Sequence, residues 1–196
     1  MAEDKPRRIL DAAVRVFAAR GYEATRVGDI AKEAGVAYGL VYHYYGSKDA
    51  VLEAVFREAW GRLLAAVALA EETGATAPEQ LELGVKIGLR AWRDDPDLVR
   101  LLVREITRSP HIHDELDEIG QAFASLERIV ARGQTEGTFR PGLDPRIAAW
   151  MLYGALEEVL TGWVLGQLPD DAQAVAAAER EVVATFVGGL RVPAAD

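Results

Sequence analysis

The tyrosines and the histidine between residues 38 and 44 are the side chains in this sequence whose types and spacing best suit a chemical task, the recognition of a polar polymer. Phenol hydroxyls and an imidazole can hydrogen-bond phosphate oxygens and base edges, and a glycine among them lets a backbone approach a nucleic-acid groove. The residues expected on the outward face of one short helix are Tyr38, Gly39, Tyr42 and His43. A tyrosine-rich helix is also typical of a protein core, so the interpretation depends on the surrounding elements.

Other reactive side chains are poorly placed for catalysis. His111 and His113 form an H-x-H next to two acidic residues, which favours a solvated helix start over a metal site. Glu157 and Glu158 are adjacent and point about 100° apart on a helix, so they cannot act as a facing carboxylate pair. The sequence has no Cys, no G-x-S-x-G, no phosphate-cradling glycine loop and no H-E-x-x-H. We therefore expect no enzyme activity, no cofactor and no metal.

The elements that would position the tyrosines are two short helices joined by a tight turn. Thr25 has a hydroxyl suited to cap the first helix, whose apolar residues recur at helical spacing as far as Ala34. Gly35 can adopt the left-handed conformation that an abrupt turn requires, and Val36 can fill the angle between the helices. The second helix is expected from about residue 37 to residue 45.

This second helix has an inward and an outward side. Leu40, Val41 and one of two adjacent tyrosines are available to pack inward. Ser47 is suited to cap the following helix, which places Lys48 and the positive N-terminus of that helix against a phosphate. Helix, glycine turn, helix and capped helix in this order predict a helix-turn-helix that binds double-stranded DNA.

Residues 7 to 52 carry a longer ordered pattern of the same kind. It comprises Ile9, Ala12, Ala13, Phe17, Gly21, Tyr22, Thr25, Ile30, Ala31, Ala34, Gly35, Val36, Gly39, Tyr42, Tyr45, Ser47, Lys48 and Leu52. This segment resembles the DNA-binding segment of the TetR family of bacterial one-component transcription regulators. It departs from the family pattern at Ala37, where Ser or Thr is common, and at Tyr44-Tyr45, where His-Phe is common. The expected DNA contacts are Thr25, Arg26, Ala37, Tyr38, Gly39, Leu40, Tyr42, His43, Tyr44 and Lys48.

Length and composition limit the remaining possibilities. A chain of 196 residues can bury about 70% of its unfolded surface in an ordinary core. The absence of cysteine excludes a disulfide framework and fits a reducing cytosol. The N-terminus lacks the apolar core of a signal peptide, and no apolar run reaches the roughly 18 residues of a membrane helix. We therefore expect a soluble, cytoplasmic protein that does not associate with a membrane.

The charges are distributed unevenly along the chain, whose formal net charge is −9. Residues 1 to 50 contain 8 Lys and Arg against 7 acids, whereas the remaining residues contain 14 against 24. The near-neutral segment of residues 1 to 50, with its few cations, can face phosphates. The acidic remainder is repelled by DNA, and this difference orients the protein as it approaches DNA.

Helical signals continue to the end of the chain and strand signals are scarce, so we predict an all-α fold of about nine helices. The first helix is expected from about Pro6. Beyond the helix-turn-helix, helices are expected at about 47–73, 78–94, 96–109, 113–136, 144–168 and 172–190. We divide the chain into a helix-turn-helix domain, residues 1–50, and a helical ligand-binding and dimerisation domain, residues 51–196.

The last two predicted helices are apolar over more than one face. A helix of that kind must bury against the core on one side and against something else on the other. We expect a homodimer through a four-helix bundle, which would hold the two helix-turn-helix domains at the spacing of successive major grooves of DNA. The residues expected at the interface are Leu156, Leu160, Trp163, Val183, Phe186 and Val187. An internal helix of a monomer is the alternative.

Aromatic and aliphatic residues of several helices would converge in the middle of the helical domain. They are Trp60, Trp92, Leu98, Leu102, Phe123, Trp150 and Tyr153, with Arg104 as a cation. Cavities of this kind suit small apolar ligands, although plain core packing explains any one residue equally well. Residues 101–109 and 154–166 resemble segments of acyl-CoA-responsive fatty-acid-metabolism repressors of the TetR family. That resemblance implies an acyl chain in the bundle and CoA phosphates on cations such as Arg90, Arg93, Arg104 or Arg108.

These expectations combine into one function. The chain is predicted to be a ligand-responsive repressor that binds a near-palindromic operator as a dimer and is released by a small apolar effector, with a long-chain acyl-CoA as the candidate. Two alternatives remain open: a dimeric DNA-binding protein whose C-terminal domain only dimerises, and an all-helical small-molecule carrier.

Overall fold

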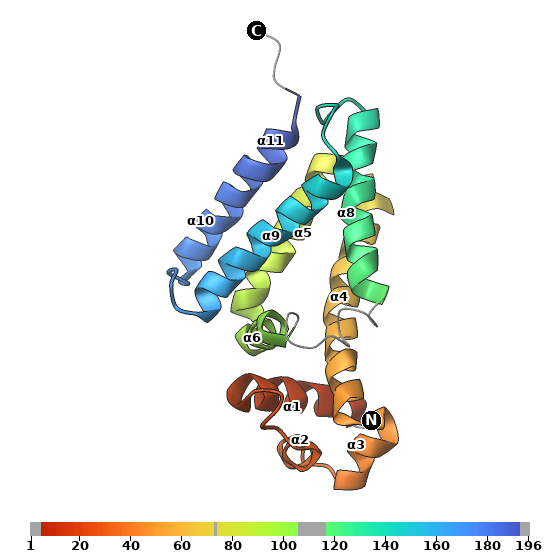
Figure 1. Ribbon diagram of the computed structural model, residues 1–196, viewed down its shortest axis with the longest axis vertical. Coiled ribbons are helices and arrows are strands. Elements are labelled where there is room, and N and C mark those ends of the chain that lie inside the picture. Colours follow the sequence, from red (N-terminus) through yellow and green to blue (C-terminus); the bar gives the residue numbers. More distant parts are fainter. Residues whose placement is uncertain (1–4, 73, 106–116, 193–196) are drawn as a thin grey trace. The chain divides into compact units, whose positions relative to one another are not determined.

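The computed structural model describes residues 5–72, 74–105 and 117–192, which form helices joined by short loops (Figure 1). The helices are α1 (Lys5–Arg20), α2 (Val27–Ala34), α3 (Tyr38–Tyr45), α4 (Lys48–Glu72), α5 (Ala77–Asp94), α6 (Pro96–Glu105), α8 (Asp117–Thr135), α9 (Pro145–Val164) and α10 (Ala172–Val182). The π-helical segment η1 (Val183–Val187) and α11 (Gly188–Leu190) continue α10 without a break. No strand occurs in these ranges, in which one isolated bridge pairs Phe139 with Arg191. The predicted all-α fold is confirmed.

Helices begin where short side chains satisfy their first backbone N–H groups. Asp95 accepts a hydrogen bond from the backbone N–H of Leu98 at 3.0 Å, so α6 starts at the predicted place. Asp144 caps α9 in the same way and accepts from the backbone N–H of Arg146 at 2.8 Å. The predicted end of α6 and the predicted start of α8 at His113 lie outside the described residues.

Helix α9 ends at Val164, four residues before the predicted Leu168. Gly166 has a left-handed φ of +67°, and the backbone N–H of Gln167 donates to the Gly162 carbonyl at 2.8 Å. Leu168 then folds back over Gly162, where an added Cβ would lie 2.6 Å from Leu168 Cδ1. The prediction was too long because apolar spacing continues past a glycine that ends the helix.

The helices pack into two compact units. The first consists of Met1–Ala59 and Asp95–Leu116, and the second consists of Trp60–Asp94 and Asp117–Asp196. The first part of α4 and the whole of α6 therefore belong to the same unit as α1, α2 and α3. A functional division at residue 50 stays a prediction, because the packing units divide α4 between them.

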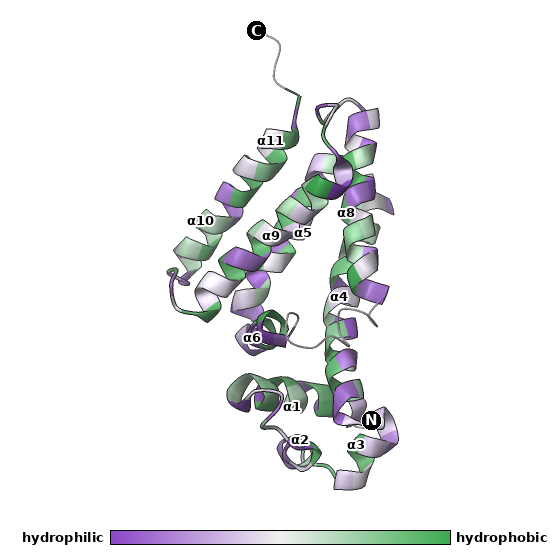
Figure 2. Cartoon of the chain, in the orientation of Figure 1, coloured by the Kyte–Doolittle hydropathy of each residue, from purple (hydrophilic) through white to green (hydrophobic). Residues whose placement is uncertain are grey.

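Each unit has its own apolar core. In the first, α1 packs on α2 and α6, and the fully buried side chains include Ile9, Phe17, Ile30, Val51 and Phe56. In the second, α5, α8, α9 and α10 pack together around Leu81, Val85, Leu89, Val130, Leu152 and Val175. Hydrophobic colouring alternates with hydrophilic segments along α9 (Figure 2), and its large side chains Ile147, Trp150 and Met151 are exposed, so this helix has apolar surface beyond the side that meets the core.

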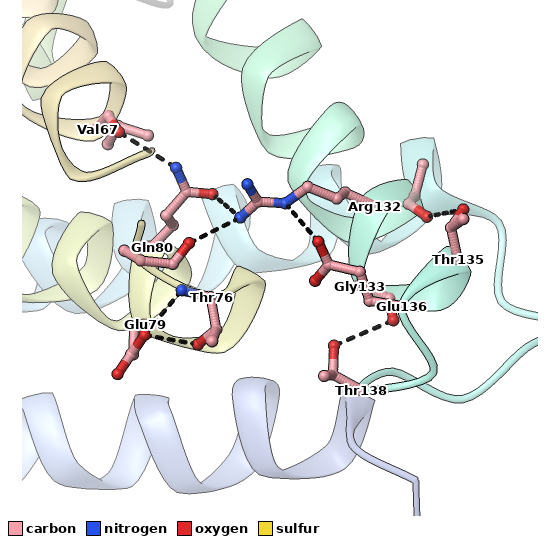
Figure 3. Close-up of polar contacts among 11 residues, drawn as sticks. Val67, Thr76, Glu79, Gln80, Arg132, Gly133, Thr135, Glu136 and Thr138 are labelled. Carbon is pink, nitrogen blue, oxygen red and sulfur yellow. Dashed lines mark hydrogen bonds and ion pairs between the residues drawn. The ribbon is translucent and has the colours of Figure 1, made fainter. Parts of the chain in front are cut away.

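A buried polar contact ties α4 to α5 and α8 in the second unit (Figure 3). The side-chain amide of Gln80, which is 0% exposed, donates to the Val67 carbonyl at 3.3 Å. Its oxygen accepts from Arg132 at 2.5 Å, and the same guanidinium nitrogen donates to the Ala75 carbonyl at 3.2 Å. Since buried polar groups without partners are costly, this contact specifies how the end of α4 lies against its neighbours.

Candidate functional sites

The turn between α2 and α3 has the geometry that the sequence predicts. Gly35 has a left-handed φ of +63°, and the backbone N–H of Val36 donates to the Ala31 carbonyl at 3.0 Å. The guanidinium of Arg8 donates to the Ala34 carbonyl at 2.6 Å, which satisfies a further acceptor at the end of α2. Because its terminal carbonyls are satisfied, α2 ends sharply and α3 leaves at a defined angle.

The start of α2 differs from the prediction. Thr25 is 2% exposed and its hydroxyl donates to the Gly21 carbonyl at 2.8 Å, so it neither caps the helix nor faces outward. The capping position belongs to Arg26, whose backbone N–H donates to the Asp29 carboxylate at 3.0 Å. That bond, and then the nearby Arg20, lower the pKa of Asp29 below its usual value. The expected DNA contact by Thr25 is corrected on the same ground, since its side chain is buried.

Helix α3 presents aromatic side chains to solvent. Tyr38 is 56%, Tyr42 43% and Tyr44 41% exposed, whereas Val41 is 1% exposed. The Tyr38 hydroxyl donates to the Tyr42 hydroxyl at 3.1 Å, and their ring centroids are 5.2 Å apart. Gly39 and His43 are exposed beside them, which confirms the predicted outward set.

The remaining residues of α3 show which of its two adjacent tyrosines packs inward, a choice that the sequence left open. Tyr45 is the tyrosine that turns inward, and its hydroxyl donates to the Pro6 carbonyl at 2.9 Å. Ala37 occupies the capping position of α3 without a side-chain bond, and its backbone is exposed together with that of Gly39. Leu40 is half-buried. The outward surface of α3, which we call the reading face, therefore consists of Ala37, Tyr38, Gly39, Tyr42, His43 and Tyr44.

Lys48 is engaged inside its own unit. Its ammonium donates to the Tyr22 carbonyl at 2.9 Å and lies 4.1 Å from the centroid of the Tyr22 ring. The Tyr22 hydroxyl donates to Asp49, and burial together with this bond raises the pKa of Tyr22. Ser47 caps α4 as predicted by accepting from the Ala50 N–H at 3.0 Å. Lys48 thus fastens the start of α4, and a phosphate contact there would have to share its ammonium.

Arginines of α1 and of the start of α2 differ in whether their guanidinium groups form ion pairs. Arg15 pairs with Glu33 at 2.8 Å, and Arg20 pairs with Asp29 at 3.0 Å. Arg26 is exposed, and it contributes to the cap of α2 through its backbone alone. Since a guanidinium on a solvated surface is available to a phosphate oxygen, Arg26 is the best-placed cation of the expected DNA contacts.

Four aromatic rings from three helices meet in the second unit. Phe123 of α8 stacks on Trp150 of α9 with ring centroids 4.5 Å apart, and its centroid lies 4.8 Å from that of Tyr153. Trp60 of α4 stacks on Tyr153 at 6.2 Å. We call Trp60, Phe123, Trp150 and Tyr153 the aromatic cluster. The structure therefore brings together four of the residues predicted to contact a ligand.

The other predicted ligand residues lie elsewhere. Trp92 stacks on Trp163 at 6.3 Å, and its indole N–H donates to Asp170 at 3.3 Å, so it belongs to a second aromatic pair. Leu98, Leu102 and Arg104 are on α6 in the first unit, where Arg104 donates to the Ala18 carbonyl at 3.2 Å. Sequence spacing could not show this, because it does not reveal which helices α6 packs against.

The cations proposed for CoA phosphates are also differently placed. Two guanidinium nitrogens of Arg90 bind the two carboxylate oxygens of Glu179 at 2.8 and 2.9 Å. Arg93 is exposed on the last turn of α5, whereas Arg108 lies outside the described residues. A phosphate would thus have to displace Glu179 from Arg90.

Two residues expected at a dimer interface lie in the interior of their own chain. Trp163 is 3% exposed and donates to the Pro169 carbonyl at 3.0 Å, and Val187 is 0% exposed. Leu156, Leu160, Val183 and Phe186 are half-buried. The exposed apolar side of α9 consists instead of Ile147, Trp150 and Met151, which are 56%, 48% and 57% exposed. The helical spacing of Ile147 and Met151 opposite the buried Ala149 and Leu152 was the signal for this orientation.

The described residues hold neither a metal-binding cluster nor a helix that could span a membrane. His111 and His113 lie outside the described residues, and within the described ranges no three His, Cys, Asp or Glu side chains gather as they would around a metal ion. In the same ranges no helix has the length and apolar character of a membrane span.

Comparisons with known proteins cover nearly the whole chain. The family described as bacterial regulatory proteins, tetR family, matches residues 9–55, and the family described as YsiA-like protein, C-terminal region, matches residues 56–185. The chain is 30% identical to the fatty acid metabolism regulator protein of Bacillus subtilis strain 168 over 194 residues, which cover 97% of this chain and 98% of that protein.

Solved structures show the same similarity. The fatty acid degradation regulator FadR of Bacillus halodurans matches with a TM-score of 0.84 and 30% identity, over 94% of this chain and 99% of that one. FadR of Bacillus subtilis in complex with stearoyl-CoA matches with a TM-score of 0.83, 30% identity and the same coverage. These relatives are regulators and not enzymes, in agreement with the predicted absence of catalysis.

Proposed function

The chain belongs to the TetR family of bacterial regulatory proteins, and we propose that this transcription repressor binds operator DNA as a homodimer and is released by an acyl-CoA thioester. The observation that carries the proposal is the match over nearly the full length with a regulator that holds stearoyl-CoA, together with an aromatic cluster inside the second unit. A regulator of chromosomal genes works in the cytoplasm, and we place the protein there.

The reading face of α3 supports the DNA-binding part of the proposal. Its exposed hydroxyls and imidazole can donate to phosphate oxygens and base edges, and the exposed backbone at Gly39 permits close approach to the groove. The exposed Arg26, at the start of α2, adds a charge for a phosphate. We expect Tyr38, Tyr42 and His43 to contact base edges. Tyr44 and Arg26 are expected to contact the phosphate backbone of the DNA.

The exposed side of α9 supports a dimer. Ile147, Trp150 and Met151 are large apolar side chains that are each about half exposed in the single chain. They form an apolar surface that a second copy could cover in a twofold arrangement. Two reading faces held in this way would meet successive major grooves of a near-palindromic operator.

The aromatic cluster supports an apolar effector. Its rings come from α4, α8 and α9 and are only half-buried, so an acyl chain placed among them would remove further apolar surface from water. Burial of apolar surface contributes about 25 cal/mol per Å². A chain of many methylenes would thus gain several kcal/mol, enough to bias a conformational equilibrium.

Helix α4 offers a route from effector to DNA because it belongs to both packing units. Its residues up to Ala59 pack with α1 to α3, while Trp60 contributes to the aromatic cluster and Val67 is bonded to Gln80. An effector that binds best to one position of Trp60 would increase the population of α4 conformations with that position. Because α3 directly precedes α4 in the chain, the reading face would shift with it. A coupling of about 1–3 kcal/mol would change operator occupancy 5- to 150-fold.

Fluorescence anisotropy with duplex DNA from the region upstream of its own gene tests the proposal. We expect the full chain to bind one duplex tightly and stearoyl-CoA to release it, while CoA alone does not. Tyr42→Ala should abolish tight binding while leaving the helical content unchanged. Tight binding that stearoyl-CoA leaves unaltered would favour a DNA-binding protein whose second unit only dimerises, and no binding to any such duplex would reject the proposal.

A further inference from the structure

The indole N–H of Trp60 is a buried hydrogen-bond donor without a partner. Its nitrogen is enclosed by the protein, and no described residue accepts from it. A buried donor left unsatisfied costs about 1–3 kcal/mol, and proteins satisfy nearly all such groups. The position of this donor, in the aromatic cluster, makes a missing acceptor from a ligand a specific explanation.

The chain satisfies its other buried indoles, which shows that Trp60 is an exception. Trp92 donates to Asp170 at 3.3 Å, and Trp163 donates to the Pro169 carbonyl at 3.0 Å. Both of those rings are less than 6% exposed, like many core residues. Trp60, by contrast, is half-buried and stacks on Tyr153 with its N–H unpaired.

The ring that stacks on Trp60 carries a second hydrogen-bonding group. The hydroxyl of Tyr153 makes no hydrogen bond within the described part of the chain. Burial and the neighbouring Glu157 raise the pKa of Tyr153, so the phenol stays neutral and able to donate. The pKa of Glu157 is itself raised, by burial and then by the charge of Glu158. Two stacked rings of the aromatic cluster therefore each carry a donor that has no partner among the described residues.

A plain hydrocarbon chain cannot accept a hydrogen bond from either donor, whereas a carbonyl or hydroxyl oxygen can. We propose that the Trp60 N–H, together with the hydroxyl of the stacked Tyr153, binds an oxygen of the effector's acyl portion. This contact would select effectors that carry an oxygen at the position that meets Trp60. The oxygen is either the thioester carbonyl or an oxygen substituent on the chain. This inference rests on the proposed function, because it assigns a specificity-determining contact to the acyl effector.

Affinities for stearoyl-CoA and two analogues distinguish a bound thioester carbonyl from a bound oxygen on the chain. Stearoyl-CoA is compared with S-octadecyl-CoA, in which a methylene replaces the carbonyl, and with 3-hydroxystearoyl-CoA, which adds a hydroxyl. If the carbonyl is bound, wild type prefers stearoyl-CoA over the thioether by about tenfold. If a chain oxygen is bound, wild type prefers the hydroxylated analogue by about the same factor. In Trp60→Phe, which removes the N–H and keeps an aromatic ring, the preference should fall to about onefold.

Trp92→Phe is the matched control, because it also removes one indole from the same unit but away from the aromatic cluster. It should keep the wild-type preference. Tyr153→Phe, which removes only a hydroxyl, should reduce the preference partially. A preference that survives in Trp60→Phe, or its absence in wild type, would overturn the inference.

A measurement on wild type avoids dependence on the folding of a variant. Labelling with 15N-tryptophan gives one indole resonance for each of the four tryptophans. The Trp60 indole proton should move downfield when the preferred thioester binds, and the Trp92 proton should move less. Binding that leaves the Trp60 proton in place contradicts this inference alone, whereas the absence of any thioester binding contradicts the proposed function and the inference with it.

Discussion

Arg132 of α8 donates to the side-chain oxygen of Gln80 of α5 at 2.5 Å, and Gln80 in turn donates to a backbone carbonyl of α4. Gln80 is fully enclosed, so both its donor and its acceptor find partners within the protein. This pair holds the distal part of α4 to two helices of its unit, close to the loop that follows α4 (Figure 3).

Gln80→Met should destabilise the protein by about 1–3 kcal/mol, because methionine fills a similar volume but removes the bond to the Val67 carbonyl and leaves a partly buried Arg132 N–H without this acceptor. Urea unfolding measures the change. Gln121→Met, on an exposed position of α8, is the control and should change the free energy of unfolding by less than about 0.5 kcal/mol. Equal effects of the two substitutions would show that the buried bonds contribute little.

Two glycines of α8 should respond oppositely to alanine. At Gly133 an added Cβ would lie 2.2 Å from a ring carbon of the buried Phe139, so Gly133→Ala should destabilise by about 3 kcal/mol or more. At Gly120 nothing lies within 4 Å of the added Cβ, so Gly120→Ala should stabilise by about 0.5–1 kcal/mol. Thermal unfolding compares them, and a tolerated Gly133→Ala would mean that Phe139 can move aside.

Arg26→Ala should weaken operator binding uniformly across related sequences and reduce the magnitude of the salt slope by about 1, because one phosphate contact is lost. The cap of α2 should survive, since Arg26 contributes to it through its backbone N–H. Arg140→Ala removes an equally exposed guanidinium from the second unit and should leave the slope unchanged. Identical slopes for wild type and Arg26→Ala would remove Arg26 from the DNA-binding surface.

Met151→Glu should break the proposed dimer, because it places a carboxylate without a partner in the buried apolar contact between two copies of α9. We expect the dimer dissociation constant to rise about 100-fold or more. Sedimentation equilibrium measures it, with Gln121→Glu as a control that adds the same charge on an exposed position of α8. A dimer that tolerates Met151→Glu would place the interface on another surface.

Asp29→Asn should lower the melting temperature near neutral pH, and the difference from wild type should shrink in acid. The Arg26 N–H and Arg20 favour the carboxylate, so the pKa of Asp29 is lower in the folded state than in the unfolded chain. Its contribution is therefore present above the unfolded value of about 3.9 and is lost as the pH falls through the lower folded value. A difference that stays constant between pH 7 and pH 3 would argue against this cap.

The local features of α1 to α3 could be predicted from sequence because short-range chemistry determines them. The left-handed Gly35, the cap at Ser47 and the outward tyrosines follow from residue type and helical spacing. Thr25 was predicted wrongly as a cap because Arg26 occupies the capping position of α2, and the Thr25 hydroxyl donates to the Gly21 carbonyl. Lys48 was predicted to face a phosphate, which stays a prediction, and sequence spacing did not show that its ammonium also binds the Tyr22 carbonyl.

The sequence by itself determined the helical architecture, the reading face of α3 and the apolar character of α9, since these depend on neighbours within one or two turns. Only the tertiary structure decided that Trp163 meets Trp92 in the core, that Met151 faces out, and which rings join Trp60. The physical reason is that an apolar helix can turn any of its sides to the core. The rotation it adopts depends on packing against helices distant in sequence, which periodicity does not encode.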